Sequence, residues 1–274
     1  MRAITLFMTG LAGLAGAPAW ADPTVKANTN CGGSYDTQAG TTTAHAFCVD
    51  QNPDLVIDAE GVGQAVAHAE LGILKVRADA FYHLDKHGVP VFTSGRPTAS
   101  FEDQITITPS NPALAGMTGW ATATFHLDGS APSGTGIYLF GKAGGAFDGG
   151  KVIDTIPTYE IVIPDNGSHS VDQDLKLRMS FTYGVAFNFG LSLDVIIGDS
   201  GTADFSNTFK LTGLATTDFF GNAIPGASFT GSAGTDWLAI AQANAAAVPE
   251  PGTLSFFALG LAGLLAASRR KSQR

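Results

Sequence analysis

Apolar and polar residues alternate along much of the chain, most regularly between Leu175 and Ile197. Every odd position in this segment is apolar or aromatic, whereas many even positions are polar or charged. A period of two with one apolar face is typical of a half-buried β-strand. One unbroken strand of this length would run to about 75 Å, far beyond the usual length. We therefore expect the chain to fold back or bend at Gly184, and Gly190 is a candidate β-bulge.

Shorter segments repeat this alternation and end in turn-forming residues. They are residues 101–107, 121–127, 159–163 and 205–211, and one of them runs directly into the turn dipeptide Asp128-Gly129. Many short strands separated by turns favour a mainly β fold, an antiparallel β-sandwich of jelly-roll or immunoglobulin-like type. We assign this domain to residues 22–235.

Residues 62–86 fit two patterns. Apolar residues from Val62 to Ala80 recur at spacings of three and four, as in a helix, but residues 74–80 also alternate as in a strand. Gly61, Gly63 and Gly72 disfavour one long helix by about 1 kcal/mol each relative to alanine. We therefore predict two strands here. The other helix candidate is the alanine-rich stretch after Trp237, and we expect residues 236–247 to act as a linker.

The N-terminal residues 1–21 have the pattern of a secretory signal peptide. A single arginine precedes an apolar run, which ends in Ala19-Trp20-Ala21. A charged start, a short apolar middle and an Ala-x-Ala end allow a segment to enter the export machinery and be cut. We predict a signal helix that signal peptidase removes between Ala21 and Asp22. The alternative is a retained membrane anchor.

The C-terminal segment, residues 248–274, has three parts. Pro249, Glu250 and Pro251 precede an apolar run over residues 253–267, which is followed by the basic residues Arg269, Arg270 and Lys271. A helix over the apolar run would be about 22 Å long, short of the roughly 30 Å core of a bilayer. It can enter a membrane but is a poor permanent transmembrane helix. The basic residues favour a cytoplasmic C-terminus, and the prolines keep the preceding backbone extended.

These three parts resemble the PEP-CTERM sorting signal of Gram-negative bacteria. The resemblance implies that the membrane enzyme exosortase processes the chain, which associates transiently with the inner membrane through residues 253–267. It also implies delivery to the cell surface or the exopolysaccharide matrix. The same tail is sometimes labelled an ice-binding-protein C-terminal domain, a label that says nothing about binding ice. Residues 201–237 also resemble the closing part of many PEP-CTERM β-sandwich proteins, with no catalytic residues to carry over.

The charge of the exported part excludes one class of partner. Between Asp22 and Val248 there are 10 basic and 23 acidic residues, which gives a net charge of −13. Nucleic-acid-binding proteins need a basic face that displaces counterions from the phosphate backbone. We therefore expect no nucleic-acid partner.

Cys31 and Cys48 are the two cysteines of the chain, and both lie in the exported part. An even number of cysteines in an oxidising compartment favours a disulfide. Closing a loop of about 17 residues would stabilise the fold by around 3 kcal/mol, because the crosslink restricts the unfolded chain. The alternative is a pair of thiols that bind metal or lie apart.

Two groups of residues are candidate metal ligands. His83 and His87 would share one face of a helix, but the glycine and proline that follow favour a solvated turn. Asp172 and Asp174, after Asp165-Asn166-Gly167, offer oxygen atoms to calcium, although a charged hairpin end is the favoured interpretation. His45, His68, His126 and His169 have no motif partners. We predict no metal or cofactor, and calcium stays open.

No motif for a nucleophilic serine, a zinc protease or a phosphate loop occurs in the sequence. The leading hypothesis is a secreted, non-enzymatic protein of the cell surface or extracellular matrix, associated with exopolysaccharide. One rival is a carbohydrate-binding or adhesive module that uses Trp120 or Trp237, although Trp120 fits a core position better. The other rival is a matrix hydrolase with two carboxylates brought together in space.

Overall fold

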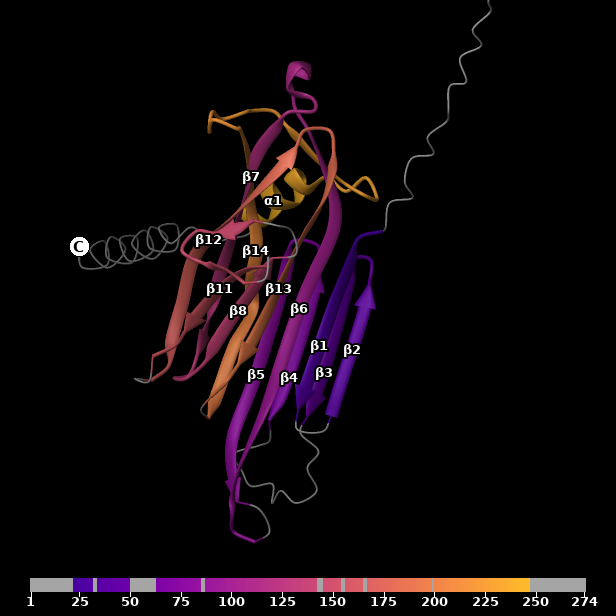
Figure 1. Cartoon of the computed structure of the whole chain (residues 1–274). Coiled ribbons are helices and arrows are strands. Elements are labelled where there is room, and N and C mark those ends of the chain that lie inside the picture. The colour runs from indigo at the N-terminus through magenta and orange to yellow at the C-terminus, as the bar shows by residue number, and fades with distance from the viewer. Residues whose placement is uncertain are drawn as a thin grey trace, which may run out of the picture.

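The computed structural model describes residues 22–31, 34–49, 63–84, 87–141, 145–153, 156–164, 167–198 and 200–246, which are mainly antiparallel β-structure (Figure 1). The predicted mainly β, antiparallel fold is confirmed. The predicted signal peptide and C-terminal apolar helix lie outside the described residues. The elements are β1 (Thr24–Cys31), β2 (Ser34–Gly40), β3 (Thr43–Val49), β4 (Gln64–Glu70), β5 (Ile73–Leu84), β6 (Pro90–Thr108), a 3-10 helix (Pro112–Leu114), β7 (Thr118–Ala131), β8 (Gly136–Gly141), β9 (Ala146–Phe147), β10 (Lys151–Ile153), β11 (Ile156–Val162), β12 (His169–Thr182), β13 (Ala186–Ile196), β14 (Gly201–Asp218), β15 (Ser228–Gly231) and α1 (Trp237–Ala246).

Strand pairing links all fifteen described strands into one sheet, which has two halves. The first half-sheet has the order β2-β1-β6-β13-β8-β11-β10, with β15 also paired to β6. The second half-sheet has the order β3-β4-β5-β14-β7-β12-β9. The halves are joined where β5 pairs with the first residues of β6. Because every pairing is antiparallel, short turns make many of the connections.

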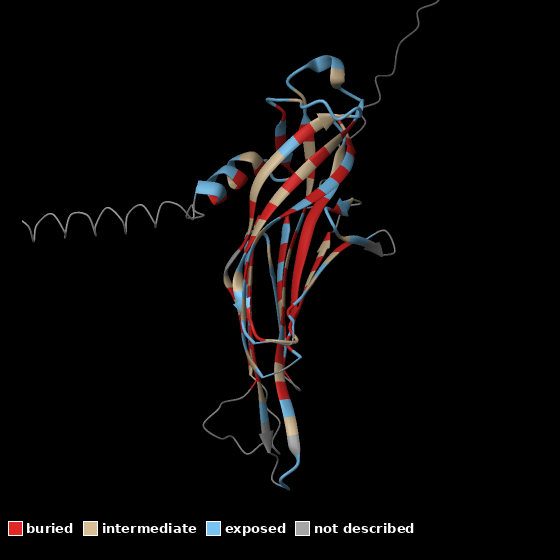
Figure 2. Cartoon of the chain, turned by 90° about the vertical axis from the view of Figure 1, so that its left-hand side faces the viewer, coloured by how far each residue is buried: buried red, intermediate tan, exposed pale blue. Residues whose placement is uncertain are grey.

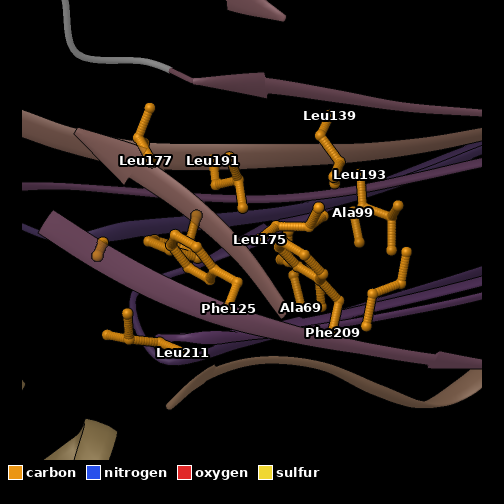
Figure 3. Close-up of a cluster of buried hydrophobic side chains, with 14 of the residues drawn as sticks. Ala69, Ala99, Phe125, Leu139, Leu175, Leu177, Leu191, Leu193, Phe209 and Leu211 are labelled. Atoms are coloured by element: carbon orange, nitrogen blue, oxygen red, sulfur yellow. The ribbon is translucent and has the colours of Figure 1, made fainter. Parts of the chain in front are cut away.

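The inner faces of the two half-sheets share one hydrophobic core. Leu175 and Leu177 of β12 belong to the same buried cluster as Leu191 and Leu193 of β13 (Figure 3). Buried and exposed positions alternate along the strands (Figure 2), so each half-sheet has one apolar and one solvated face. Burial of the apolar face supplies the main driving force for folding, and the outer faces are left for other roles.

The long alternating segment does turn at Gly184, as predicted, but its two strands do not pair. Gly184 has φ +80°, and the Val185 N–H donates to the Thr182 carbonyl at 3.0 Å. β12 pairs with β7 and β9, whereas β13 pairs with β6 and β8. The turn therefore carries the chain from the second half-sheet to the first, and both strands keep their apolar residues toward the shared core.

The predicted bulge at Gly190 is wrong. Gly190 lies opposite Glu102 within a regular register of β13 and β6. The irregular pairing is in β14, where the register with β5 shifts between Phe205 and Phe209 and the register with β7 shifts between Leu211 and Gly213. A glycine in a strand marks either a bulge or a close approach of side chains, and sequence alone does not separate these roles.

The prediction of two strands in residues 62–86 is confirmed. β4 and β5 pair in an antiparallel hairpin, with Glu70 opposite Ile73 across the turn. Gly72 occupies the turn with φ +76°, a conformation that favours glycine. Ala65, Ala67 and Ala69 are buried. The alternation with a period of two therefore predicts the structure of this segment correctly, and the helical spacing of its apolar residues does not.

Gly95 marks the point at which β6 passes from one half-sheet to the other. Residues 90–94 pair with β5, and residues 95–102 pair with β1. A Cβ at Gly95 would overlap the carbonyl oxygen of Gln64 and lie 2.7 Å from the Cβ of Ala65. The absence of a side chain lets β4 approach β6 closely, and this approach closes the sheet on itself.

We expect Gly95→Ala to lower the free energy of unfolding by about 2–3 kcal/mol, because backbone atoms of β4 must move to accept the methyl group. Urea denaturation measures the change. Gly213→Ala is the matched control, since a Cβ there meets Thr124 at an ordinary 3.5 Å. Equal unfolding midpoints for the two variants would contradict the proposed close approach.

The α-helix α1 packs against the sheet and does not stand apart from it. Trp237 and Ala241 are buried, and the Asn244 side-chain amide donates to the Gly72 carbonyl at 3.4 Å. Residues 236–247, which we expected to act as a linker, thus contain a helix that is anchored in the core. Within the described ranges, no helix has the length and apolar character needed to cross a membrane.

Candidate functional site

Trp237 and Asp103 form a polar site in the interior of the fold. The Trp237 Nε1–H donates to one carboxylate oxygen of Asp103 at 2.8 Å. The hydroxyl and the N–H of Ser232 donate to the other oxygen at 2.6 and 3.2 Å. The Trp237 ring also packs against the rings of Phe101 and Phe189 at centroid distances of 5.5 and 5.0 Å. Buried carboxylates need such donors, so this site anchors α1 to the first half-sheet.

The structure reverses the expected roles of the two tryptophans. Trp237, considered as a sugar-stacking residue, is fully buried. Trp120, which fitted a core position better, is half-buried at an outer-face position of β7. The guanidinium of Arg178 lies over the Trp120 ring, 4.4 Å from its centroid. Trp120 falls on the polar side of the alternation, and its size misled the sequence interpretation.

The predicted disulfide between Cys31 and Cys48 is confirmed. The two Cα atoms are 5.9 Å apart, and both side chains are buried. Cys31 ends β1 in the first half-sheet, whereas Cys48 lies in β3 of the second. The bond therefore ties the two half-sheets together near one edge and is structural.

The acidic pair Asp172 and Asp174 contacts a histidine of the neighbouring strand. The two ring nitrogens of His126 in β7 lie 3.7 and 3.1 Å from carboxylate oxygens of Asp172 and Asp174. Asp165 and Asn166 lie outside the described residues. Among the residues that the structure does describe, no group of three or more His, Cys, Asp or Glu side chains is arranged to hold a metal ion.

The other histidines are spread over β3, β4, β5, β12 and the turn before β6. His83 is in β5 and His87 is in the turn before β6, so the two do not share a face of a helix. The side chain of His83 lies outside the described residues. His45 and His68 lie opposite each other in β3 and β4, with ring centroids 6.2 Å apart. His68 also contacts Glu70 at 2.6 Å, and His169 begins β12.

The outer face of the first half-sheet carries two aromatic side chains that sequence reasoning missed. Tyr138 and Phe140 occupy alternate positions of β8, and both are half-buried. Their ring centroids are 6.4 Å apart and their planes differ by 13°. In the sequence Gly-Ile-Tyr-Leu-Phe-Gly both faces look apolar. Only the burial of Ile137 and Leu139 shows that the two aromatic residues point outward.

Charged groups beside these rings are bound to one another. Asp194 of β13 accepts hydrogen bonds from Nε and Nη2 of Arg96 and from the Thr98 hydroxyl. The hydrogen bond with Asp194 raises the pKa of Arg96 further above its ordinary value. Burial, followed by the charge and the hydrogen bond of Glu160, raises the pKa of the Tyr138 hydroxyl. At neutral pH a neutral Tyr138 phenol thus lies beside the Arg96–Asp194 ion pair and the Glu160 carboxylate.

A sharp turn at residues 218–222 exposes Phe219 and Phe220. The Asp218 carboxylate accepts hydrogen bonds from the side-chain amide and the N–H of Asn222 at 2.7 and 2.8 Å. The side-chain bond from Asn222 is the main cause of the lowered pKa of Asp218, and the backbone N–H groups of the turn add to it.

We expect the pKa of Asp218 to lie below its ordinary value and Asn222→Ala to raise it part of the way back. Because the folded pKa lies below the unfolded one, the carboxylate stabilises the turn fully above the unfolded pKa. That contribution is lost as the pH falls through the folded pKa. Carbon-detected NMR titration measures the pKa. Phe220→Ala, which keeps every donor, is the control, and an equal rise in that variant would argue against the assigned cause.

A comparison with protein-family models finds the PEP-CTERM protein-sorting motif at residues 247–271. The chain thus carries a PEP-CTERM sorting motif at its C-terminal end. The matched range contains the predicted Pro249, Glu250 and Pro251 and the basic Arg269, Arg270 and Lys271, all outside the described residues. A PEP-CTERM motif implies an exported protein that passes through the membrane to the cell surface and is processed by exosortase. No curated protein matches the chain.

Proposed function

We propose that this PEP-CTERM protein is a non-enzymatic component of the cell surface or extracellular matrix and associates with exopolysaccharide there. The observation that carries the proposal is the sorting motif, which follows directly on the anchored helix α1. In this proposal, signal peptidase cuts between Ala21 and Asp22, and exosortase then removes the tail. The remaining body has two half-sheets facing each other, which supports a β-sandwich architecture.

Two of the three buried aspartates have partners that give them a structural role, which is compatible with a non-enzymatic protein. Asp103 is held by donors from Trp237 and Ser232, and Asp194 is held by Arg96 and Thr98. A general acid or base must reach substrate with a proton to exchange. These carboxylates instead satisfy internal donors and hold strands together, which is a structural role.

A second candidate function is carbohydrate binding by an outer face of the sheet. The specific observation is the pair of parallel, half-buried aromatic rings on β8. Aromatic side chains with polar neighbours are typical of surfaces that bind ligands with both apolar and polar parts. This function is compatible with the first and would explain retention in a polysaccharide matrix.

Fractionation of cells tests the sorting proposal. We expect the full chain in the surface and matrix fractions and a chain lacking residues 248–274 in the medium. Pro249→Ala/Pro251→Ala is the matched control, because it changes the motif and keeps the apolar run. We expect this variant to stay in the inner membrane unprocessed. Equal release of all three proteins, or Arg274 still present on the surface form by mass spectrometry, would contradict the proposal.

A further inference from the structure

We propose that Tyr138 and Phe140 form a binding strip for a neutral polysaccharide on the outer face of the first half-sheet. The inference deepens the proposed function, on which it rests, by naming a site and a class of ligand. The strip follows β8, which lies between β13 and β11 (Figure 1).

The two rings are spaced and oriented to contact consecutive sugars. Alternate residues of a strand repeat about every 6.6 Å, and the ring centroids are 6.4 Å apart with a 13° angle between planes. The two rings thus follow the repeat of the strand with nearly parallel planes. A pyranose ring has an apolar C–H face, which packs on an aromatic face and removes apolar surface from water.

The Tyr138 ring is held in place before any ligand arrives. Glu160 of β11 lies directly opposite it in the strand register. The outer edge of the ring lies over Gly136, where a Cβ would fall 2.7 Å from the ring carbon Cε2 and from the hydroxyl oxygen. A side chain that is already ordered loses little conformational entropy on binding, so the stacking energy is available for affinity.

Polar groups flank the rings on both sides. On β13, Asp194 lies opposite Tyr138 and Ser192 lies opposite Phe140. On the other side, Thr158 of β11 lies opposite Phe140. These three residues are buried, and Asp194 is already bound to Arg96 and Thr98. The exposed Glu160, opposite Tyr138 on β11, is therefore the residue we expect to bind sugar hydroxyl groups beside the rings.

The charges favour a neutral glycan over an acidic one. Arg96 is the cation next to the strip, and it is already paired with Asp194. Glu160 adds a negative charge, and the exported part as a whole carries −13. A polyanionic chain would therefore be repelled at long range.

Trp120, on the outer face of the second half-sheet, is less suitable for stacking on a sugar. Arg178 already covers its ring at 4.4 Å from the centroid. A sugar would have to displace this cation before it could stack. Trp120 therefore provides a matched control, an outward aromatic residue that is not part of the strip.

Affinity electrophoresis of the surface-processed protein tests the proposal. Exopolysaccharide from the host is separated by anion exchange into neutral and acidic fractions, and each is cast into native gels. We expect the neutral fraction to retard the protein and the acidic fraction to leave it unretarded. We expect Tyr138→Ala/Phe140→Ala to weaken binding at least about tenfold and Tyr138→Phe to weaken it less, whereas Trp120→Ala stays within about threefold of the parent.

Thermal unfolding confirms that each variant is folded before binding is compared. Tyr138→Phe keeps the ring and removes the hydroxyl, so a smaller loss of affinity than in the double variant would assign the remaining affinity to stacking. Retardation by the acidic fraction alone, equal retardation of the double variant, or no retardation by the neutral fraction would each overturn the proposal. Sorting to the surface is measured separately by fractionation, so loss of glycan binding with normal sorting leaves the proposed location intact.

Discussion

Trp237→Ala is expected to lower the free energy of unfolding by about 3–5 kcal/mol, the largest effect of any single substitution considered for this protein. The change removes a fully buried ring that packs on Phe101 and Phe189. It also takes one donor from the buried Asp103 carboxylate, and a buried acceptor left without its donor costs further stability. Urea denaturation followed by far-UV circular dichroism measures the loss.

Trp120→Ala is the matched control for this experiment, because it removes the same side chain from an outer face. Its main interaction is with Arg178, and a cation over an exposed ring contributes about 0.5–1 kcal/mol. If the two substitutions destabilised the protein equally, the anchoring role of Trp237 would be refuted. Trp237→Phe should fall between them, since it keeps part of the packing and loses the hydrogen bond.

Removal of the Cys31–Cys48 disulfide is expected to lower the free energy of unfolding by about 3 kcal/mol. The bond closes a loop with a sequence separation of 17 and joins β1 to β3 across the two half-sheets. Cys31→Ala/Cys48→Ala should therefore unfold at a lower urea concentration than the oxidised parent, because its unfolded chain is less restricted.

The reduced parent protein provides the control for the cysteine variant. Reduction should lower the urea midpoint to about that of the double alanine variant, since both lack the crosslink. Both cysteines are buried, so reduction is carried out in urea and then followed by refolding. A midpoint that dithiothreitol does not change would show that the bond contributes no stability.

The strands were predictable from sequence because alternation follows directly from the geometry of a half-buried strand. The alternation from Leu175 to Ile197 predicted both strands and the turn at Gly184. The even number of cysteines predicted the disulfide. Alternation does not contain information on pairing partners. The assignment of β12 and β13 to opposite half-sheets therefore appeared only in the structure.

The candidate site was less predictable than the fold, because its residues depend on which face of a strand is buried. Tyr138 and Phe140 look like core residues in the sequence, and Trp237 sits in a segment that resembles a linker. Asp103 gives no local signal of its buried role, since its donors lie 129 to 134 residues away in the sequence. The sorting tail was recognisable because its order of proline, apolar and basic residues is a linear signal.

The pairing of β6 with strands from both ends of the body links folding to export. β6 pairs with β1 near the N-terminus and with β15 near residue 230, so the sheet is complete only after most of the body has been translocated. Such non-local pairing gives a high contact order and slow folding. The hydrogen bond from Trp237 to Asp103 joins residues 134 positions apart, so it too needs nearly the whole body. The apolar run begins sixteen residues after Trp237. In the proposed export route, every residue that completes the sheet therefore precedes the tail on its way out of the cell.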